Sequence, residues 1–169
     1  MANITEAEFK YRLSRVKLLT LDVDGVLTDG GLFYSESGEE LKRFNVKDGM
    51  GMKLLLEAGI EIAIITASAK VSTQYRAKKL GVTHVFLGIE DKLAQLQQLC
   101  QELGISLEEV AYMGDDVNDL ACLKAVGCPI TVADAMPVNK DCAIYVTRLN
   151  GGQGAVREIC DQLLEVRLS

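Results

Sequence analysis

The chain has 169 residues, of which 49% are hydrophobic and 25% are charged, and it contains no tryptophan. This composition is typical of a single globular domain and excludes a disordered or fibrous chain. The formal charge is −6, from 18 basic and 24 acidic residues, without a basic block, so a nucleic-acid partner is not expected.

The first half of the chain begins an alternation of helical and extended segments. Thr5 and Glu8 form a capping-box signature before a short helix, and VKLLTLDV at 16–23 predicts the first strand. A glycine-rich hinge follows. Residues 30–44 predict two short strands around a turn at 36–39, a hairpin that is the one irregular insertion.

The rest of the chain continues the alternation regularly. We expect helices near 47–58, 70–80, 91–103 and 117–126 and from about 155, and strands at 60–66, 84–87, 110–113, 129–132 and 143–147. Gly81 and Gly104 end two of these helices. The pattern predicts an α/β fold, a doubly wound parallel sheet with helices on both faces. We expect 1–169 to be a single domain, with the hairpin insertion at about 30–44 and a C-terminal tail at about 151–169.

The cysteines, the histidine and the N-terminus indicate the compartment. Five cysteines without C-x-x-C spacing lie mostly among apolar residues, which indicates buried free thiols in a reducing compartment. The single histidine, His84, is expected to be a strand residue, so the chain has too few histidines for a His-rich zinc site. The N-terminus has no apolar signal region, and the longest apolar run, 62–67, is too short to span a bilayer. We expect a cytoplasmic protein without a membrane partner.

Acidic residues follow two of the predicted strands, at the sheet edge where open α/β sheets bind ligands. Asp22 and Asp24 lie two residues apart, so in extended chain both project into one crevice and repel each other unless a cation lies between them. Asp115 reaches the same crevice if its strand lies beside the first. Mg²⁺ takes a few hard oxygen ligands and leaves room for water and phosphate, so these three residues predict a magnesium site.

A hydroxyl and a cation complete the pattern. Thr66 ends a strand, and Lys92 lies in the first turn of a helix, where a cation opposes the helix dipole unless an anion is nearby. Both can hold phosphate oxygens. With Asp22 as nucleophile and Asp24, next to Gly25, as general acid and then base, the set suits phosphoryl transfer.

Each of these signals also has a plainer explanation. A lone D-x-D-G is a common turn sequence, and acids at 115, 116 and 119 could merely cap a helix. Thr66 could be an ordinary β-branched strand residue. The functional interpretation depends on all the signals meeting at one edge of one sheet.

Four segments taken in order, DVDGVLTDG at 22–30, IIT at 64–66, DK at 91–92 and GDDVNDL at 114–120, resemble the four motifs of the haloacid dehalogenase superfamily. FNVKDGMG at 44–51, YVTR at 145–148 and GGQGAVRE at 151–158 extend the resemblance over nearly the whole chain. They resemble the small-capped branch that includes 3-deoxy-D-manno-octulosonate 8-phosphate (KDO 8-phosphate) phosphatase. The resemblance implies no large cap domain. It also implies a Mg²⁺-dependent phosphatase that works through an aspartyl-phosphate and serves lipopolysaccharide precursor synthesis.

The resemblance also implies roles for single residues. Asp22 would be the nucleophile and a metal ligand, Asp24 the acid and base that binds metal through its carbonyl, and Asp115 the remaining ligand. Thr66 and Lys92 would hold the phosphate. Substrate contacts are implied for Asp24, Lys92 and a further group formed by Asn45, Val46, Lys47, Asp48, Gly49, Lys53 and Arg76.

The hairpin and the C-terminal segment bear on assembly. Relatives in this branch are tetramers whose hairpins form a shared barrel and whose C-terminal tails reach a neighbour's site, which implies a homotetramer. A lone hairpin is marginal in water, which favours such pairing. The alternative is a hairpin that packs on its own domain.

One departure concerns the substrate. Relatives commonly carry Gly-Arg after the hydroxyl residue of the second motif, whereas this chain has Ala67-Ser68, and Lys70 is a candidate to replace the missing cation. A nine-carbon keto acid 9-phosphate of the sialic acid or KDN type also stays open as the substrate, because the shape of the hairpin and a neighbour's tail decide the length of the pocket.

Two alternatives belong to other classes of protein. A signalling receiver domain also gathers acids, a threonine and a lysine around Mg²⁺, but it carries its accepting aspartate on the third strand. A non-catalytic oligomerisation module of the same fold tends to lose an aspartate, whereas this chain keeps Asp22, Asp24, Lys92 and Asp115.

Overall fold

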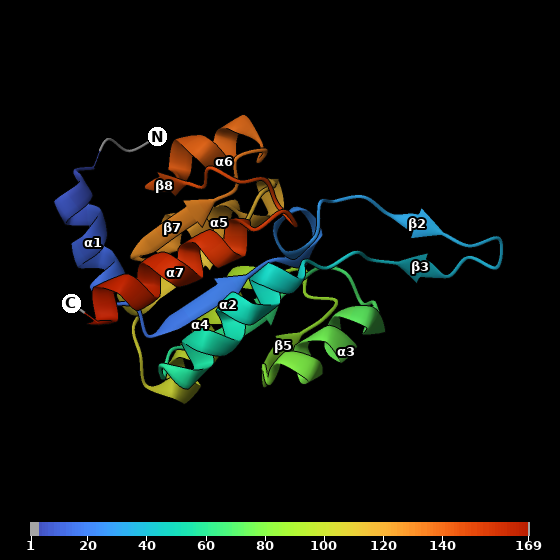
Figure 1. Cartoon of the computed structure of the whole chain (residues 1–169), viewed down its shortest axis with the longest axis horizontal. Helices are drawn as coiled ribbons and strands as arrows, with labels where there is room; N and C mark the ends of the chain where they lie inside the picture. The colour runs from blue at the N-terminus through green and yellow to red at the C-terminus, as the bar shows by residue number, and fades with distance from the viewer. Residues whose placement is uncertain (1–3, 169) are drawn as a thin grey trace.

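The computed structural model describes residues 4–168 and contains a six-stranded sheet of order β5-β4-β1-β6-β7-β8, in which all neighbours are parallel. Its strands are β1 (Leu18–Leu21), β4 (Glu61–Ile65), β5 (His84–Phe86), β6 (Val110–Met113), β7 (Cys128–Thr131) and β8 (Tyr145–Val146). Helices cover both faces (Figure 1), so the doubly wound fold is confirmed. Of the predicted domain 1–169, residues 1–3 and 169 lie outside the described part.

The helices lie against two separate apolar layers. They are α1 (Glu6–Ser14), α2 (Val46–Glu57), α3 (Val71–Leu80), α4 (Lys92–Leu103), α5 (Leu120–Ala125), α6 (Pro137–Cys142) and α7 (Ala155–Leu168). Successive strand residues point to opposite faces. Leu19 therefore packs with Met52 of α2 and Ile159 of α7, while Leu18 packs with Leu96 of α4. The central strand is buried on both sides.

Most predicted helix ends are confirmed by their capping groups. The Thr5 hydroxyl accepts a hydrogen bond from the backbone N–H of Glu8, 3.1 Å away, at the start of α1. Gly81 and Gly104 adopt left-handed backbone at the ends of α3 and α4, with φ of 84° and 65°. Because only glycine adopts this conformation without steric cost, these two positions stop their helices.

Three segments differ from the prediction. The first strand ends at Leu21, and residues Val23–Leu27 (η1) form an irregular turn in place of its last residues. The helix expected at 117–126 begins as a 3₁₀ turn, η3 (Val117–Asp119), before α5. Helix α6 was missed between two predicted strands, because six residues carry too little periodicity, although Pro137 at its first position is a usual helix start.

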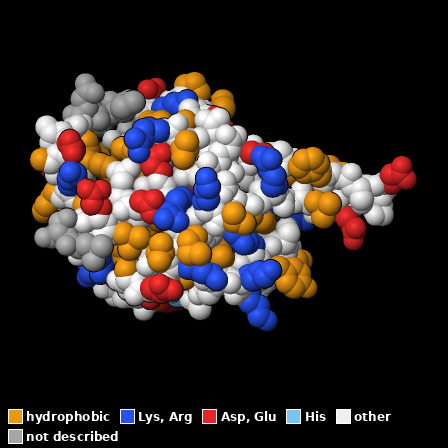
Figure 2. Space-filling view, in the orientation of Figure 1, with side chains coloured by type: hydrophobic (Ala, Val, Ile, Leu, Met, Phe, Trp, Pro, Cys, Tyr) orange, Lys and Arg blue, Asp and Glu red, His pale blue; other side chains and the backbone are white. Residues whose placement is uncertain are grey.

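The hairpin forms a sheet of its own. β2 (Phe33–Tyr34) and β3 (Glu40–Leu41) pair antiparallel, and the turn between them runs from Ser35 to Gly38, one residue earlier than predicted. The hairpin projects away from the main sheet (Figure 1) and carries hydrophobic side chains on its surface (Figure 2). The exposed apolar residues of this hairpin are Leu32, Phe33, Tyr34 and Leu41.

The remaining sequence expectations concern thiols, histidine and membrane spans. All five cysteines are free, and Cys100, Cys122, Cys128 and Cys160 are buried, as predicted. His84 lies in β5, with Nε2 3.4 Å from Glu61 Oε2. Within residues 4–168, no helix is both long enough and apolar enough to cross a membrane.

Candidate active site

The strand order brings the predicted site residues to one edge of the sheet. β1 lies between β4 and β6, with Leu21 in register with Ile64 on one side and Met113 on the other. The residues that follow these strands therefore meet at their carboxyl ends. They line a cavity of about 140 Å³ formed by Asp22, Asp24, Thr66, Ala67, Ser68, Asp115, Asp116 and Asn118.

The turn after β1 depends on Gly25. Its φ is +88°, and a Cβ at this position would lie 2.0 Å from Asp115 Oδ2. Any larger residue would displace the Asp115 carboxylate, so the glycine lets the two loops approach each other. The D-x-D-G sequence therefore forms a turn, as the plainer explanation predicted. The same turn also forms part of the cavity wall.

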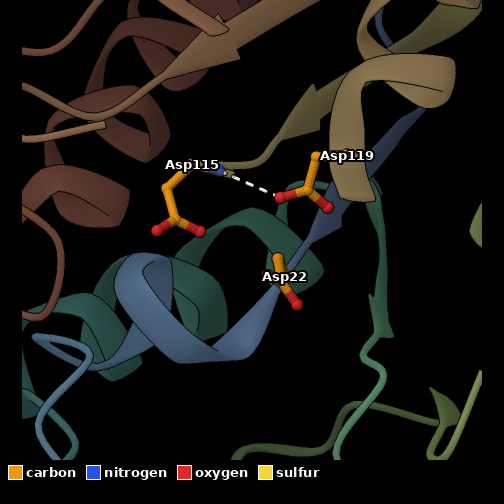
Figure 3. Close-up of side chains that lie close together, drawn as sticks. All are labelled: Asp22, Asp115 and Asp119. Carbon is orange, nitrogen blue, oxygen red and sulfur yellow. Dashed lines mark hydrogen bonds between the residues drawn. The ribbon is translucent and has the colours of Figure 1, made fainter. Parts of the chain in front are cut away.

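Three carboxylates gather behind this turn (Figure 3). One oxygen from each of Asp22, Asp115 and Asp119 lies within 4.8 Å of the others. Asp22 and Asp119 are buried, with 5% and 0% of their surface exposed. Asp115 Oδ1 is buried and forms no hydrogen bond among the described residues. An unpartnered buried carboxylate oxygen is costly unless a cation is bound.

Asp119 is the member whose oxygens are already engaged. Its Oδ1 accepts hydrogen bonds from Lys92 Nζ and from the Tyr112 hydroxyl, both at 2.7 Å, and its Oδ2 accepts one from the backbone N–H of Asp115 at 3.0 Å. Asp119 therefore holds the loop that carries Asp115. Asp115, together with Asp22, which has one oxygen paired with Lys92, is left with room for a metal.

The electrostatics of the cluster favour a divalent cation. Burial and then the charge of Asp119 raise the pKa of Asp22 to about 6, against the opposing effect of Lys92. Burial, followed by the charges of Asp22 and Asp119, raises the pKa of Asp115 to about 7. Like charges crowded in a low dielectric resist ionisation, and a bound cation removes this repulsion. The hard oxygen donors suit Mg²⁺.

Lys92 lies under the cluster rather than in the cavity wall. Asp91 caps α4 by accepting the Ala94 N–H, which directs Lys92 inward from the first helical position. Its Nζ lies 2.9 Å from Asp22 Oδ1 and its side chain is 1% exposed. Burial lowers the pKa of Lys92, but Asp22 and Asp119 outweigh it and the net shift is upward. The sequence predicted an anion near Lys92, and in the structure the carboxylates of Asp22 and Asp119 are these anions.

Thr66 and Asp24 lie on other sides of the cavity. Thr66 is buried, and its hydroxyl accepts a hydrogen bond from the Ser68 N–H at 3.1 Å. The Asp24 side chain is outside the acidic cluster. Both of its carboxylate oxygens accept hydrogen bonds from Lys42 Nζ, at 2.7 and 2.6 Å.

Of the residues implied for substrate contacts, Asp24 lines the carboxylate cavity, whereas the further group lies on α2, just before it and, for Arg76, on α3, outside this cavity. Arg76 donates to the backbone oxygen of Asn45 at 3.1 Å and lies over Gly49, where a Cβ would be 2.2 Å from Arg76 Nη2. Asp48 is buried and accepts the Arg157 N–H at 2.8 Å. Residues Val46, Lys47 and Lys53 are exposed on α2.

Several contributors were not singled out from the sequence. Asp119 appeared only as a possible helix cap, and Tyr112 and Lys42 carried no signal. The four-residue spacing of Asp115 and Asp119 could have indicated the role of Asp119, because a carboxylate at that distance can accept a hydrogen bond from the backbone N–H of Asp115. Lys70, the candidate cation near Ser68, lies 3.8 Å from Glu40, and the cation bonded to Ser68 is Lys42.

Comparison with known proteins agrees with this geometry. A family model described as haloacid dehalogenase-like hydrolase matches residues 86–159. The 3-deoxy-D-manno-octulosonate 8-phosphate phosphatase KdsC of Escherichia coli is 46% identical over 158 residues, 94% of this chain and 84% of that protein.

Two solved structures of phosphatases with this name superpose closely. The Yersinia pestis structure has a TM-score of 0.93 at 43% identity, covering 95% of this chain and 86% of that chain. The Moraxella catarrhalis structure, in complex with a magnesium ion, a phosphate ion and KDO, has a TM-score of 0.94 at 39% identity, covering 96% and 93%. These relatives cover 94–96% of the chain, so their match includes the N-terminal half, which lies outside the family model.

Proposed function

Because this chain belongs to the haloacid dehalogenase-like hydrolases, and within them to the 3-deoxy-D-manno-octulosonate 8-phosphate phosphatase family, we propose that it hydrolyses KDO 8-phosphate to KDO and phosphate. The observation that carries the proposal is the meeting of Asp22, Asp24, Thr66 and Asp115 around one cavity at the sheet edge. A receiver domain is the weaker explanation, since the close relatives are phosphatases.

Asp22 acts as the nucleophile in the proposed reaction. Its carboxylate oxygen attacks phosphorus, a bond from Asp22 to phosphorus forms, and the bond from phosphorus to the sugar oxygen breaks. Asp24 gives its proton to the leaving sugar oxygen. Lys92, 2.9 Å from Asp22 Oδ1, orients the nucleophile. The product of this step is an aspartyl-phosphate and the free sugar acid.

Water then releases the phosphate. Asp24, now ionised, takes a proton from a water molecule as its oxygen attacks phosphorus, and the bond from Asp22 to phosphorus breaks. Inorganic phosphate leaves, Asp22 regains its carboxylate and Asp24 its proton. Thr66 and Lys92 hold phosphoryl oxygens during both steps.

Magnesium is the cofactor of this family's reaction and the acidic cluster is suited to it. The carboxylates of Asp22 and Asp115, with the backbone carbonyl of Asp24, would hold the ion, and its charge would neutralise the transferring phosphoryl group. Asp119 supports this site by fixing the Asp115 loop.

The sugar acid extends beyond the carboxylate cavity. We assign its contacts to the group at the start of α2, in which Arg76 and the exposed Lys47 and Lys53 supply positive charge in an acidic chain. Lys70 stays a candidate contact beside Ser68. A nine-carbon keto acid phosphate is the competing substrate, because these residues do not fix the length of the sugar.

Assembly and compartment complete the proposal. The exposed apolar residues of the hairpin support a homotetramer in which hairpins of several copies pair, and free buried cysteines support a cytoplasmic location. Residues 151–158 pack on their own chain in the monomer: the Gly152 N–H donates to Val26 O at 2.9 Å. We expect the chain to act as one domain.

A panel assay tests the function. Phosphate release is measured from KDO 8-phosphate, from nine-carbon keto acid 9-phosphates and from plain hexose phosphates, each with Mg²⁺ and with a chelator. The expected result is fastest release from KDO 8-phosphate and none without the metal. Preference for the nine-carbon substrates would change the assigned substrate, and no release from any of them would favour the non-catalytic module.

A further inference from the structure

Lys42 is a buried cation that joins the hairpin to the candidate acid and base. It follows β3 directly, and its side chain is 1% exposed. Its ammonium donates to both oxygens of Asp24, at 2.7 and 2.6 Å, and to the Ser68 hydroxyl at 3.1 Å. The family motifs in this sequence do not include Lys42.

The partners of Lys42 fill its capacity as a donor. An ammonium group has three hydrogens, and the two oxygens of Asp24 and the Ser68 hydroxyl accept all three. Glu40 Oε1 lies 3.6 Å away and adds an ion-pair contact. With its charge buried and its hydrogens directed at protein groups, Lys42 has no free face for a substrate. A role in holding another residue explains this arrangement better than a role in binding a ligand.

The same contacts reach into the hairpin. Glu40 lies in β3 and accepts a hydrogen bond from the hydroxyl of Tyr34 in β2, at 3.1 Å. Both strands of the hairpin are therefore connected to Asp24 through Glu40 and Lys42. Asp24, by contrast, has 36% of its side chain exposed, on the side that lines the cavity.

We propose that Lys42 is the positioning residue for Asp24, holding the acid/base carboxylate toward the cavity so that the base of the hairpin governs proton transfer to the leaving oxygen. This inference rests on the proposed phosphatase function. In the first step the proton passes from Asp24 to the sugar oxygen as the bond from phosphorus to that oxygen breaks, and Lys42 keeps the donor in line. Without Lys42, the flexible carboxylate spends most of its time out of line.

The test compares substrates whose leaving groups differ in their need for a proton. A sugar alkoxide needs the proton from Asp24, whereas p-nitrophenolate leaves without one. For Lys42→Met, kcat/KM should fall by roughly 10- to 100-fold for KDO 8-phosphate and far less for p-nitrophenyl phosphate. Lys42→Arg should restore most of the loss, because its guanidinium can pair with the same carboxylate. Inhibition by free KDO should be unchanged, since Lys42 does not touch the sugar.

Arg43→Met is the matched control. Arg43 is the next residue of the hairpin, is 64% exposed and pairs with Asp29 rather than with Asp24, so its loss removes a cation of the hairpin without changing the partners of Asp24. This variant should keep the wild-type ratio of the two substrates. Melting curves of all variants check that the fold is intact.

Several results would overturn the proposal. Equal losses with both substrates would indicate a phosphate contact or a general structural role, weaker inhibition by free KDO would indicate a sugar contact, and unchanged kinetics would remove any role. A crystal structure of Lys42→Met with Asp24 in its original position would also refute it. Should the wild-type chain release no phosphate, the proposed function fails, and this crystal structure alone decides whether Lys42 positions Asp24.

Discussion

Asp119 shows how one buried carboxylate organises the site. It is fully buried and accepts hydrogen bonds from Lys92, Tyr112 and the backbone of Asp115, so it joins α4, β6 and the loop that carries Asp115. Gly114 lets it approach, because a Cβ there would lie 2.4 Å from Asp119 Cβ. The cost of burying this charge is offset by these partners.

Replacing Asp119 with alanine should destabilise the protein strongly. The change leaves the Tyr112 hydroxyl and a backbone N–H without partners and weakens the pairing of Lys92, so we expect a loss of about 3–5 kcal/mol in the free energy of unfolding. Asp116→Ala is the control: Asp116 is exposed and its side chain caps the 3₁₀ turn by accepting from the backbone N–H groups of Val117 and Asp119, which predicts about 1 kcal/mol. Urea denaturation measures both, and equal losses would contradict the special role of Asp119.

Asp22 gives the sharpest prediction about catalysis. Asp22→Asn keeps the shape of the side chain but removes the attacking oxygen, so turnover of every phosphate ester should fall to the background of the assay. The fold should persist, because an amide can still accept from Lys92. Steady-state kinetics and circular dichroism test this together. Near-normal turnover would mean that another residue is the nucleophile.

At the scale of elements, the hairpin is the part with the weakest internal support. Each of its strands has two residues, and its apolar side chains face solvent in the single chain. A hairpin of this kind is marginal in isolation and gains stability from pairing with other strands. Charged side chains at its base pair with the turn and loop that follow β1, Lys42 with Asp24 and Arg43 with Asp29.

Removing the apolar surface of the hairpin should change the assembly. Phe33 and Leu41 face each other across the hairpin, and the double change Phe33→Ser with Leu41→Ser should produce a smaller particle in analytical ultracentrifugation. Glu36→Gln, at the exposed turn, should leave the particle mass unchanged. If the double variant keeps the wild-type mass, the hairpin is not the assembly surface.

The turn before β6 predicts a dependence on pH. Glu109 ends the 3₁₀ turn Leu107–Glu109, and Lys17, followed by the Ser106 N–H, lowers the pKa of Glu109 to about 2 from an ordinary 4.5. A lowered carboxyl pKa stabilises the fold fully above the unfolded value and loses this contribution as pH falls through the folded value. Glu109→Gln should therefore be less stable than wild type at neutral pH, and the difference should disappear as pH falls from about 4.5 toward 2. Chemical denaturation at several pH values tests this, and a constant difference would contradict it.

At the scale of the whole molecule, the segment 145–158 supports the turn that follows Asp22. Glu158 of α7 accepts the backbone N–H of Arg148 at 3.1 Å and the Tyr145 hydroxyl at 2.7 Å, which fixes the loop before α7. Gly151 on this loop lies against the turn after Asp22, where a Cβ would be 1.7 Å from Gly25 O. Residues more than 120 apart in sequence thus support one cavity.

The packing of the whole core predicts the reactivity of the thiols. Burial raises the pKa of Cys122 and Cys128 to about 12 and also raises the pKa of Cys100 and Cys160. Because the thiolate is the reactive form, these four should react slowly with Ellman's reagent in the native protein. In the native protein we expect at most one thiol, that of Cys142, to react fast. After denaturation in guanidinium, all five thiols should react. Several fast thiols in the native state would mean that the core opens readily.

The local sequence by itself determined the order of most elements and the residues at their ends. Apolar runs predicted the six strands, and Gly81 and Gly104 predicted where two helices stop, because periodicity and left-handed backbone are local properties. The edge at which Asp22, Thr66 and Asp115 meet also followed from the parallel pattern. Short elements such as α6 were missed, since six residues leave the periodicity ambiguous.

Only the tertiary structure decided which partner each side chain of the site contacts. That Asp119 engages Lys92 and Tyr112, that Lys42 holds Asp24, and that Gly151 packs on Gly25 depend on segments far apart in the chain. Spacing along a sequence cannot fix such distances, because they follow from how helices and loops pack on the sheet. The chemistry of the site was thus readable from residue types, while its geometry and electrostatics arose from the fold.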